Sequence, residues 1–281
     1  MKHIVLSHFQ VERLLAARQA GHCSANVSLD LELSTDTVAL EEGGVRFPDG
    51  QSLTWQDLDA ICASERGCFA IEGNAPRKIQ FFSEQTNQLY SLMPTSRAPT
   101  MLISGIPMHR FKDTDPHADT LDKIKAIAPV TGHVLDTATG LGYTAIQAAR
   151  SAQHVTTIEL DPAALEVARL NPWSQALFEN PKITQVIGDS FEEIVKFAAG
   201  TFACIIHDPP MFHVAGDLYS GEFYRQLYRV LRPGGRLFHY IGDLDSKSGR
   251  VVAKGAVRRL QEAGFRRVTP RPAAFGLVAS K

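Results

Sequence analysis

The stretch HVLDTATGLGY, residues 133–143, decides the fold class. It begins as a short apolar strand, continues with Asp136, and passes through a loop of small residues into a helix that starts near Tyr143. A loop without bulky side chains lets a ligand approach the backbone, and the helix behind it presents free N–H groups. This order of elements is typical of the nucleotide-type site of an open α/β sheet.

Asp136 narrows the kind of ligand that the loop suits. In the dinucleotide-binding fingerprint, the acidic residue lies about 20 residues after the loop, and phosphates occupy the loop itself. Asp136 instead directly precedes the loop, where it would repel a pyrophosphate. We therefore expect a nucleoside with a cationic or amine-bearing tail and no phosphates, a description that S-adenosylmethionine fits.

After this loop the sequence alternates between strands and helices. Strands are predicted at residues 154–161, 183–189, 202–208 and 236–242, with helices between them. Such alternation predicts an α/β fold with a parallel, doubly wound sheet and right-handed crossovers. Two further strands within residues 265–280 are too close together for a crossover, so one of them is expected to run antiparallel.

The first 97 residues have a different pattern. A helix is predicted over residues 8–20, and residues 26–33 alternate as a strand does, before further short strands joined by Gly-Gly and Asp-Gly turns. We expect residues 1–97 to form a small β-rich α+β module that covers the site or forms an oligomer interface, such as that of a homodimer. Residues 98–281 are expected to form the ligand-binding domain, with residues 98–129 as its connector and first helix.

Composition points to an ordinary globular protein. The chain has 281 residues, 44% of them hydrophobic, and no apolar run approaches the roughly 20 residues of a membrane span. Its first residues lack a signal-peptide pattern. The four cysteines form no CxxC pair, so we expect reduced thiols in a cytoplasmic protein.

The net charge of −1 is unevenly distributed. From Arg225 to Lys281 there are 13 Lys and Arg against 3 Asp and Glu, a net +10, which leaves −11 for the rest of the chain. A basic region of this kind can attract nucleic acid or an acidic partner. No aromatic residues interleave with its arginines as base-stacking platforms, so solvated faces are favoured and nucleic-acid binding is left open without being favoured.

Three acidic residues lie at the ends of three successive predicted strands: Asp136, Glu159 and Asp189. Because the carboxyl ends of parallel strands meet at one edge, these side chains are expected to face one crevice. A carboxylate at Glu159 suits two ribose hydroxyls, and Asp189 suits an adenine amine, with Ser190 nearby. Asp136 would meet the cationic tail either directly or through the loop.

Residues 130–281 resemble class I S-adenosylmethionine-dependent methyltransferases. The resemblance rests on VLDTATGLGY, TTIELDP, VIGDSFEEI, FACIIHDPP and LRPGGRLF, in the family's order and spacing. The family usually has acid-x-Gly-x-Gly-x-Gly; here Ala138 replaces the first glycine and is small enough to keep the turn. The whole arrangement looks most like uncharacterised predicted methyltransferases common in archaea, which are themselves similar to polyamine aminopropyltransferases of the spermidine synthase type.

The resemblance implies a seven-stranded mixed sheet between helix layers and S-adenosyl-L-methionine as cofactor. It implies binding by Asp136, Gly140, Gly142, Glu159, Asp189 and Ser190. We add the neighbouring positions Ala138, Tyr143, Leu160 and Asp208 to the candidate cofactor contacts.

Asp208, Pro209 and Pro210 end the strand predicted beside the first one. Prolines lack backbone donors, and carbonyls next to an aspartate suit an amine nucleophile, whose N–H bonds they accept and whose lone pair they aim. In amino-group methyltransferases a similar (Asp/Asn)-Pro-Pro is followed at once by an aromatic residue; here Met211 precedes Phe212, which weakens a flipped-base interpretation. A loop-shaping turn is the alternative. We expect an amine acceptor on a small molecule or a protein.

Further polar residues complete the candidate site. Asp208 and either His213 or His239 are the candidate catalytic residues, with a histidine as the proton acceptor. No metal is expected, because the spacing of the histidines near this end matches no metal motif. The candidate substrate contacts are His109, Arg110, Pro209, Pro210, Phe212 and Tyr219.

Methylation of an amine nitrogen is the preferred interpretation. Aminopropyl transfer from decarboxylated S-adenosylmethionine is the first alternative, because the segment SGEFYRQLYRVLRPGGRL is similar to aminopropyltransferases. Those enzymes carry an aspartate inside the glycine-rich loop, where this chain has Leu141. A second alternative is an RNA or DNA methyltransferase, or a non-catalytic nucleic-acid-associated module, and an NAD-dependent dehydrogenase fits the position of Asp136 poorly.

Overall fold

The computed structural model describes residues 3–210 and 216–281. The chain forms two compact units: one contains the residues up to His117 together with Ala163–Gln175, and the other contains Ala118–Pro162 and Ala176–Lys281. The domain boundary that we predict after residue 97 stays a prediction.

The first unit contains short antiparallel strands in three small sheets. They are connected mainly by tight turns, as the Gly-Gly and Asp-Gly pairs predict. The sheets are β1-β6-β7 (Val5–Leu6, Phe69–Glu72, Ala75–Lys78), β2-β3-β4-β5 (Ser24–Val27, Asp36–Glu41, Gly44–Arg46, Ser52–Thr54) and β11-β10-β9-β8 (Ile106–Pro107, Thr100–Ile103, Gln88–Met93, Gln80–Ser83). The N-terminal β-rich module is thus confirmed as a set of antiparallel sheets, and residues predicted as a connector carry β10 and β11.

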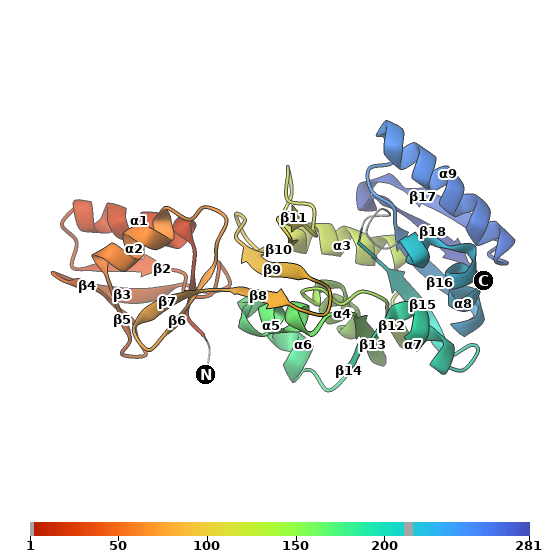
Figure 1. Ribbon diagram of the computed structural model, residues 1–281, viewed down its shortest axis with the longest axis horizontal. Coiled ribbons are helices and arrows are strands. Elements are labelled where there is room, and N and C mark those ends of the chain that lie inside the picture. The colour runs from red at the N-terminus through yellow and green to blue at the C-terminus, as the bar shows by residue number, and fades with distance from the viewer. Residues whose placement is uncertain (1–2, 211–215) are drawn as a thin grey trace. The chain divides into compact units, whose positions relative to one another are not determined.

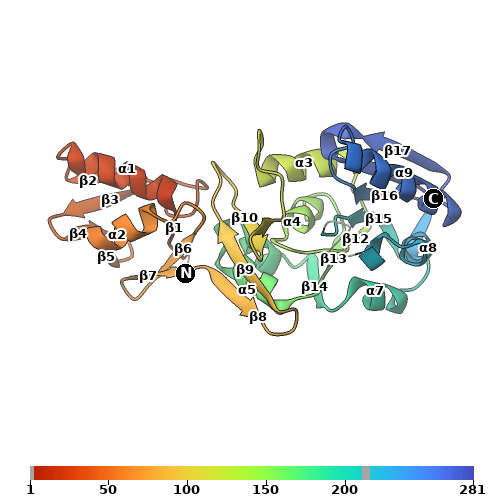
Figure 2. The same cartoon turned by 45° about the horizontal axis from the view of Figure 1, so that its top comes forward.

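Two helices, α1 (His8–Gln19) and α2 (Trp55–Cys62), pack beside each other against the four-stranded sheet β2–β5 (Figures 1 and 2). Their fully buried side chains, among them Leu14 and Leu58, form one core with the strands. Thr54 is the N-cap of α2: its hydroxyl accepts the backbone N–H of Asp57, and the Asp57 carboxylate accepts the backbone N–H of Thr54, which together form a capping box. Figure 2 shows both helices on the same sheet.

The strand predicted at residues 26–33 was too long. β2 ends at Val27, and the chain then turns, with Leu31 and Glu32 at φ of 55° and 71°. Asp30 Oδ1 accepts the backbone N–H of Leu33 and Ser34, so this side chain satisfies groups that a strand would pair. Polar and apolar side chains do alternate over residues 26–33, but the hydrogen bonds of a local polar turn replace strand pairing after Val27.

The second unit is built on the predicted seven-stranded mixed sheet (Figure 1). Its order is β14-β13-β12-β15-β16-β18-β17, and the strands are parallel except β18, which runs antiparallel to both neighbours. The α/β fold class is confirmed, as is an antiparallel strand in the closing pair. The strands are β12 (His133–Asp136), β13 (His154–Glu159), β14 (Ile183–Ile187), β15 (Phe202–His207), β16 (Leu231–Tyr240), β17 (Arg267–Arg271) and β18 (Gly276–Ser280).

Helices connect these strands, and one core lies against them. The strand residues Leu135, Ile205 and Leu237 pack with Phe223 of α8 and Leu260 of α9. β16 begins at Leu231, directly after α8 ends at Val230, and runs through Pro233, Gly234 and Gly235 with a register irregularity against β15. The helices along the chain are α3 (Pro116–Ile127), α4 (Tyr143–Ala149), α5 (Pro162–Leu170), η1 (Pro172–Ser174), α6 (Gln175–Glu179), α7 (Ser190–Glu193), η2 (Ile194–Lys196), η3 (Gly216–Tyr219), α8 (Gly221–Val230), α9 (Lys247–Glu262) and η4 (Pro272–Ala274).

Several basic residues of the C-terminal region hold backbone carbonyls inside this unit. Arg229 donates to the carbonyls of Ile194 and Phe197, and Arg236 donates to those of Ala128 and Pro129. These side chains satisfy carbonyls at the ends of helices and loops. Part of the basic excess is therefore structural, while nucleic-acid binding by the rest stays an alternative that is not favoured.

Two remaining features of the chain are the character of its helices with respect to membrane spans and the state of its cysteines. Within residues 3–210 and 216–281, no helix combines the length and the apolar character that crossing a membrane requires. All four cysteines are free thiols, and Cys204 is buried in β15 as its apolar surroundings predict.

Candidate active site

The acidic side chains singled out in the sequence lie at one edge of the seven-stranded sheet. Asp136 and Glu159 are the last residues of the neighbouring parallel strands β12 and β13. Asp208 directly follows β15 on the other side of β12, and Asp189 follows β14 by two residues. The parallel register thus brings the carboxyl ends of four adjacent strands together.

The loop after β12 is tied to both neighbouring strands. The backbone N–H of Thr137 donates to Ile206 of β15, and that of Thr139 donates to Ile158 of β13. Gly140 and Gly142 take φ of 51° and 76°, in the left-handed region that favours glycine. Gly142 is the N-cap of α4, so the loop opens a helix where the sequence predicts one.

Gly142→Ala is expected to lower the free energy of unfolding of the second unit by about 2–5 kcal/mol. Left-handed backbone costs an alanine about 1–2 kcal/mol, and overpacking adds about 1–3 kcal/mol. A Cβ there would lie 2.7 Å from Leu177 Cδ2. Gly200→Ala is the control, because its φ is 72° and its nearest contact is an ordinary 3.9 Å. Equal losses in chemical unfolding of the two variants would contradict the close approach to Leu177.

Asp136 is completely buried. Its Oδ2 accepts the Thr144 hydroxyl at 2.8 Å, and its Oδ1 lies 3.5 Å from the backbone N of Ala138. Burial raises the pKa of Asp136 to about 7; the Thr144 hydrogen bond opposes this rise, and the negative charge of Asp208 adds to it. The geometry favours the second of the two predicted routes, in which Asp136 acts on a ligand through the loop.

Glu159 braces the same loop from the neighbouring strand. Its Oε2 accepts the backbone N–H of Gly140 at 2.8 Å, and its Oε1 accepts that of Asp161 at 3.1 Å. Burial raises the pKa of Glu159, and these backbone hydrogen bonds oppose the rise. Each carboxylate oxygen keeps a second lone pair, so Glu159 retains acceptor capacity for hydroxyl groups.

Asp189 and Ser190 form the start of α7. The exposed Asp189 caps the helix, with its Oδ1 accepting the N–H of Phe191, whereas the Ser190 hydroxyl donates to the Thr137 carbonyl at 2.6 Å. Two large apolar side chains near these acids, Leu160 and Ile187, are 47% and 56% exposed. Hydroxyl acceptors beside exposed apolar surface fit a nucleoside, so these residues fit the predicted cofactor.

A lysine that the sequence reading missed lies against Asp208. Lys123 of α3 is 3% exposed, and its Nζ lies 2.6 Å from Asp208 Oδ2 and 2.9 Å from Asp119 Oδ2. The same Nζ lies 4.7 Å from the centroid of the Tyr240 ring. Burial lowers the pKa of Lys123, but the two carboxylates outweigh it, so the ammonium form is kept.

The sequence around Lys123 contains a weak indication that this lysine is buried with a charged partner. Asp119, Lys123 and Ile127 are spaced four residues apart, so they share one helix face with the apolar Ile127. All three are buried, whereas Leu121 of the same helix is 43% exposed. A charged pair on the apolar face of a helix is unusual enough to have suggested a partner elsewhere in the fold.

The Asp208 side chain is 19% exposed. Burial raises its pKa, and the charge of Lys123 opposes that rise. Pro209 is buried, and the carbonyl of Pro210 accepts the Tyr219 hydroxyl at 3.2 Å. Tyr219 therefore shapes the backbone after Asp208.

The two described histidines near this end form buried hydrogen bonds. His207 Nε2 donates to the Leu218 carbonyl at 2.9 Å, a tautomer that we assign from the acceptor, and its Nδ1 accepts the Thr137 hydroxyl. His239 Nε2 lies 2.7 Å from the Tyr224 hydroxyl. Burial lowers the pKa of His207 to about 3 and that of His239 well below its ordinary value, so both rings are neutral.

Four further candidates for the site come from the sequence alone. Phe212 and His213 lie outside the described residues. His109 belongs to the first unit, where its Nδ1 lies 3.0 Å from the Thr100 hydroxyl, and Arg110 follows it. Their roles, and that of His239 as a base, stay predictions. Residues 3–210 and 216–281 contain no group of three or more side chains arranged to hold a metal ion.

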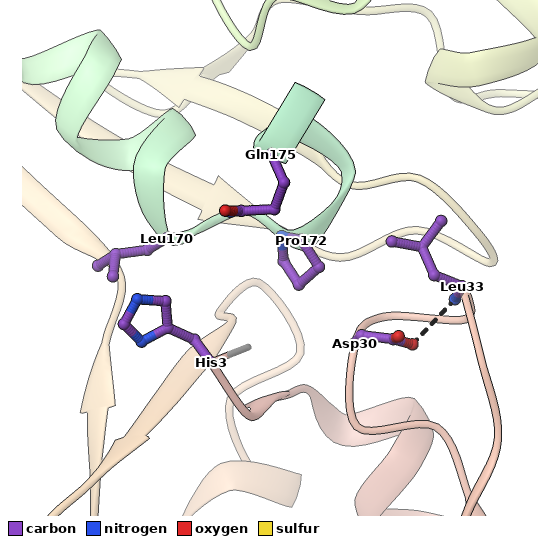
Figure 3. Close-up of a pocket in the computed structure, with 6 residues that line it drawn as sticks. All are labelled: His3, Asp30, Leu33, Leu170, Pro172 and Gln175. Carbon is purple, nitrogen blue, oxygen red and sulfur yellow. Dashed lines mark hydrogen bonds between the residues drawn. The ribbon is translucent and has the colours of Figure 1, made fainter. Parts of the chain in front are cut away.

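A pocket in the first unit has a different lining from the predicted site (Figure 3). Leu170, Pro172 and Gln175 approach it from one segment, and the remaining lining comes from the N-terminal part of the chain. Its acid, Asp30, accepts the backbone N–H of Leu33 at 3.1 Å and so serves the local turn. The lining residues are His3, Asp30, Leu33, Leu170, Pro172 and Gln175.

Residues 134–235 match the family model described as a methyltransferase domain. The uncharacterised protein MJ1233 of Methanocaldococcus jannaschii is 43% identical over 238 residues, which cover 84% of this chain and 81% of that protein.

Shorter matches involve two kinds of named enzyme. Polyamine aminopropyltransferase 2 of Streptomyces coelicolor is 33% identical, over 34% of this chain and 18% of that enzyme. Putrescine N-methyltransferase 1 of Nicotiana tabacum is 31% identical, over 34% of this chain and 27% of that enzyme. The crystal structure of spermidine synthase from Thermotoga maritima superposes with a TM-score of 0.56 at 20% identity, covering 71% of this chain and 70% of that one. At that identity the superposition shows a shared fold.

Proposed function

Because this chain belongs to the class I methyltransferase family, we propose that it transfers a methyl group from S-adenosylmethionine to an amine nitrogen. The observation that carries the proposal is Asp208, a partly exposed carboxylate directly after β15 and beside the loop of β12. Among the described residues, the hydrogen-bond partner of Asp208 is Lys123, which donates to Oδ2. The other oxygen, Oδ1, is therefore available to the amine that receives the methyl group.

The cofactor would be held by the three acids at the sheet edge. Glu159 has lone pairs for the ribose hydroxyls, Asp189 for the adenine amine, and Leu160 offers exposed apolar surface to the base. Asp136 places negative charge behind the loop where a cationic tail would lie. When bound, S-adenosylmethionine would supply an electrophilic methyl group on its sulfonium.

Asp208 would then bind and orient the acceptor. Its Oδ1 accepts an N–H of the amine and turns the nitrogen lone pair toward the electrophilic carbon. The nitrogen would become positively charged as it accepts the methyl group, with S-adenosylhomocysteine as the other product, so its N–H proton would become acidic and pass to Asp208 or to water. The raised pKa of Asp208 favours this transfer. The acceptor class, a small-molecule or protein amine, is consistent with a relative named as a putrescine N-methyltransferase.

Aminopropyl transfer is the second candidate, supported by a relative named as a polyamine aminopropyltransferase. Leu141 argues against it, because the family resemblance places an aspartate there in aminopropyltransferases, and because Leu141 is completely buried in this chain. Without that acid, the loop lacks the charge that would hold an aminopropyl ammonium group.

We expect calorimetry to give a Kd for S-adenosylmethionine at least about tenfold lower than for its decarboxylated form, a difference of about 1.4 kcal/mol. Turnover is then measured as S-adenosylhomocysteine formed with putrescine, spermidine or a lysine-rich peptide as acceptor. Tighter binding of decarboxylated S-adenosylmethionine, with aminopropyl transfer, would establish the second candidate instead. Tightest binding of NAD would contradict both.

A further inference from the structure

We propose that Lys123, anchored by Asp119, is a positioning residue that holds one oxygen of Asp208 and leaves the other directed at the acceptor amine. This inference rests on the proposed function. It concerns a residue outside every motif that carries the family resemblance.

The first ground is geometric. Lys123 Nζ contacts a carboxylate on its own helix, Asp119 at 2.9 Å, and a second carboxylate after β15, Asp208 at 2.6 Å. The Tyr240 ring, 4.7 Å away, faces the same ammonium from β16. Three elements thus fix the ammonium group, and a short charge-assisted hydrogen bond fixes the orientation of the Asp208 carboxylate.

The second ground is energetic. The Lys123 side chain is 3% exposed and that of Asp119 is completely buried, so both charges lose their hydration. Apolar side chains of similar volume often stabilise such a position as well or better. Stability alone therefore gives little reason for a buried ion network here, whereas orienting Asp208 gives a specific one.

The third ground is the local charge. Asp119 and Asp208 carry two negative charges and Lys123 one positive charge, so this trio has a net charge of −1 when all are ionised. Asp136 of β12 and the phenol of Tyr219 also interact electrostatically with Asp208. The phenol of Tyr240 interacts with that of Tyr219. Lys123 is the cation among these groups, and its charge favours the ionised form of Asp208, while the trio keeps one net negative charge beside the place of the acceptor amine.

The inference is tested by following the side-chain carboxyl carbon of Asp208 by NMR during a pH titration of the full chain. Lys123→Met is expected to raise the pKa of Asp208 by about one unit or more, because a cation within hydrogen-bond distance shifts a carboxylate by about 1–3 units. Lys123→Arg keeps the charge and is expected to change it by less than about half a unit. Asp208→Asn assigns the resonance.

A double variant, Lys123→Met with Asp119→Asn, guards against misfolding by removing the buried, unpaired Asp119 charge. In it the pKa of Asp208 is again expected to rise. Binding of S-adenosylmethionine, measured in the same variants by calorimetry, is expected to change by less than about threefold, while kcat with the best acceptor falls.

The outcomes separate the two proposals. If the wild-type chain does not bind S-adenosylmethionine, the proposed function fails. If it binds the cofactor but Asp208 titrates alike in wild type, Lys123→Met and the double variant, the positioning role of Lys123 is wrong. A pKa rise in Lys123→Met with unchanged kcat and KM would also overturn it.

Discussion

Asp208→Asn is expected to lower kcat for methyl transfer by about 10³-fold, within the range of about 10²–10⁴ for a positioned acid–base group. The asparagine keeps an oxygen that accepts from Lys123, and Lys123 keeps its ion pair with Asp119, so the fold is expected to survive. It loses the charge that takes the amine proton. The Kd for S-adenosylmethionine is expected to change by less than about threefold.

This result is measured with the acceptor that gives the fastest turnover among the amines tested. Glu222→Gln is the matched control, since Glu222 is an exposed acid in the first turn of α8 and its loss should leave kcat unchanged. Normal turnover by Asp208→Asn would show that the carboxylate has no part in the transfer. A large loss of cofactor affinity would indicate that Asp208 contacts the cofactor and not the acceptor.

Asp136→Asn is expected to weaken binding of S-adenosylmethionine by about 100-fold, or about 2.7 kcal/mol. The substitution removes the negative charge behind the loop while the asparagine oxygen still accepts from Thr144. Because the pKa of Asp136 is about 7, wild-type affinity is expected to fall about tenfold per pH unit below that value. Calorimetry between pH 5 and 8 checks this, and the variant should show no such dependence.

The same residue is expected to affect stability in the opposite direction. The pKa of Asp136 is raised from 3.8 unfolded to about 7 folded, so its stabilising contribution is complete below 3.8 and is lost as pH rises through 7. In the absence of cofactor, Asp136→Asn is therefore expected to raise the unfolding midpoint at pH 8 and to leave it unchanged near pH 4. A lower midpoint at pH 8 would mean that the buried charge is stabilised by groups beyond Thr144 and Ala138.

Local patterns and chain order account for what could be predicted. The alternation of strands and helices after residue 130 determined the sheet, because parallel strands need crossovers and a short connection between the last two strands requires one of them to be antiparallel. The same rules placed Asp136 and Glu159 at neighbouring strand ends, where the structure has them. Residues 26–33 show the limit: alternation predicted a strand, but Asp30 satisfied the local backbone with its own side chain.

The sequence by itself thus determined the α/β fold, the glycine loop and the row of strand-end acids, since each depends on spacing along the chain. The tertiary structure alone decided the charge states and partners of those acids. Lys123 and Asp208 are 85 residues apart, and no periodicity relates them. Asp136 reads as an ordinary acid beside a loop, yet complete burial raises its pKa to about 7. Desolvation and ion pairing depend on what surrounds a group in three dimensions, so only the folded chain determines them.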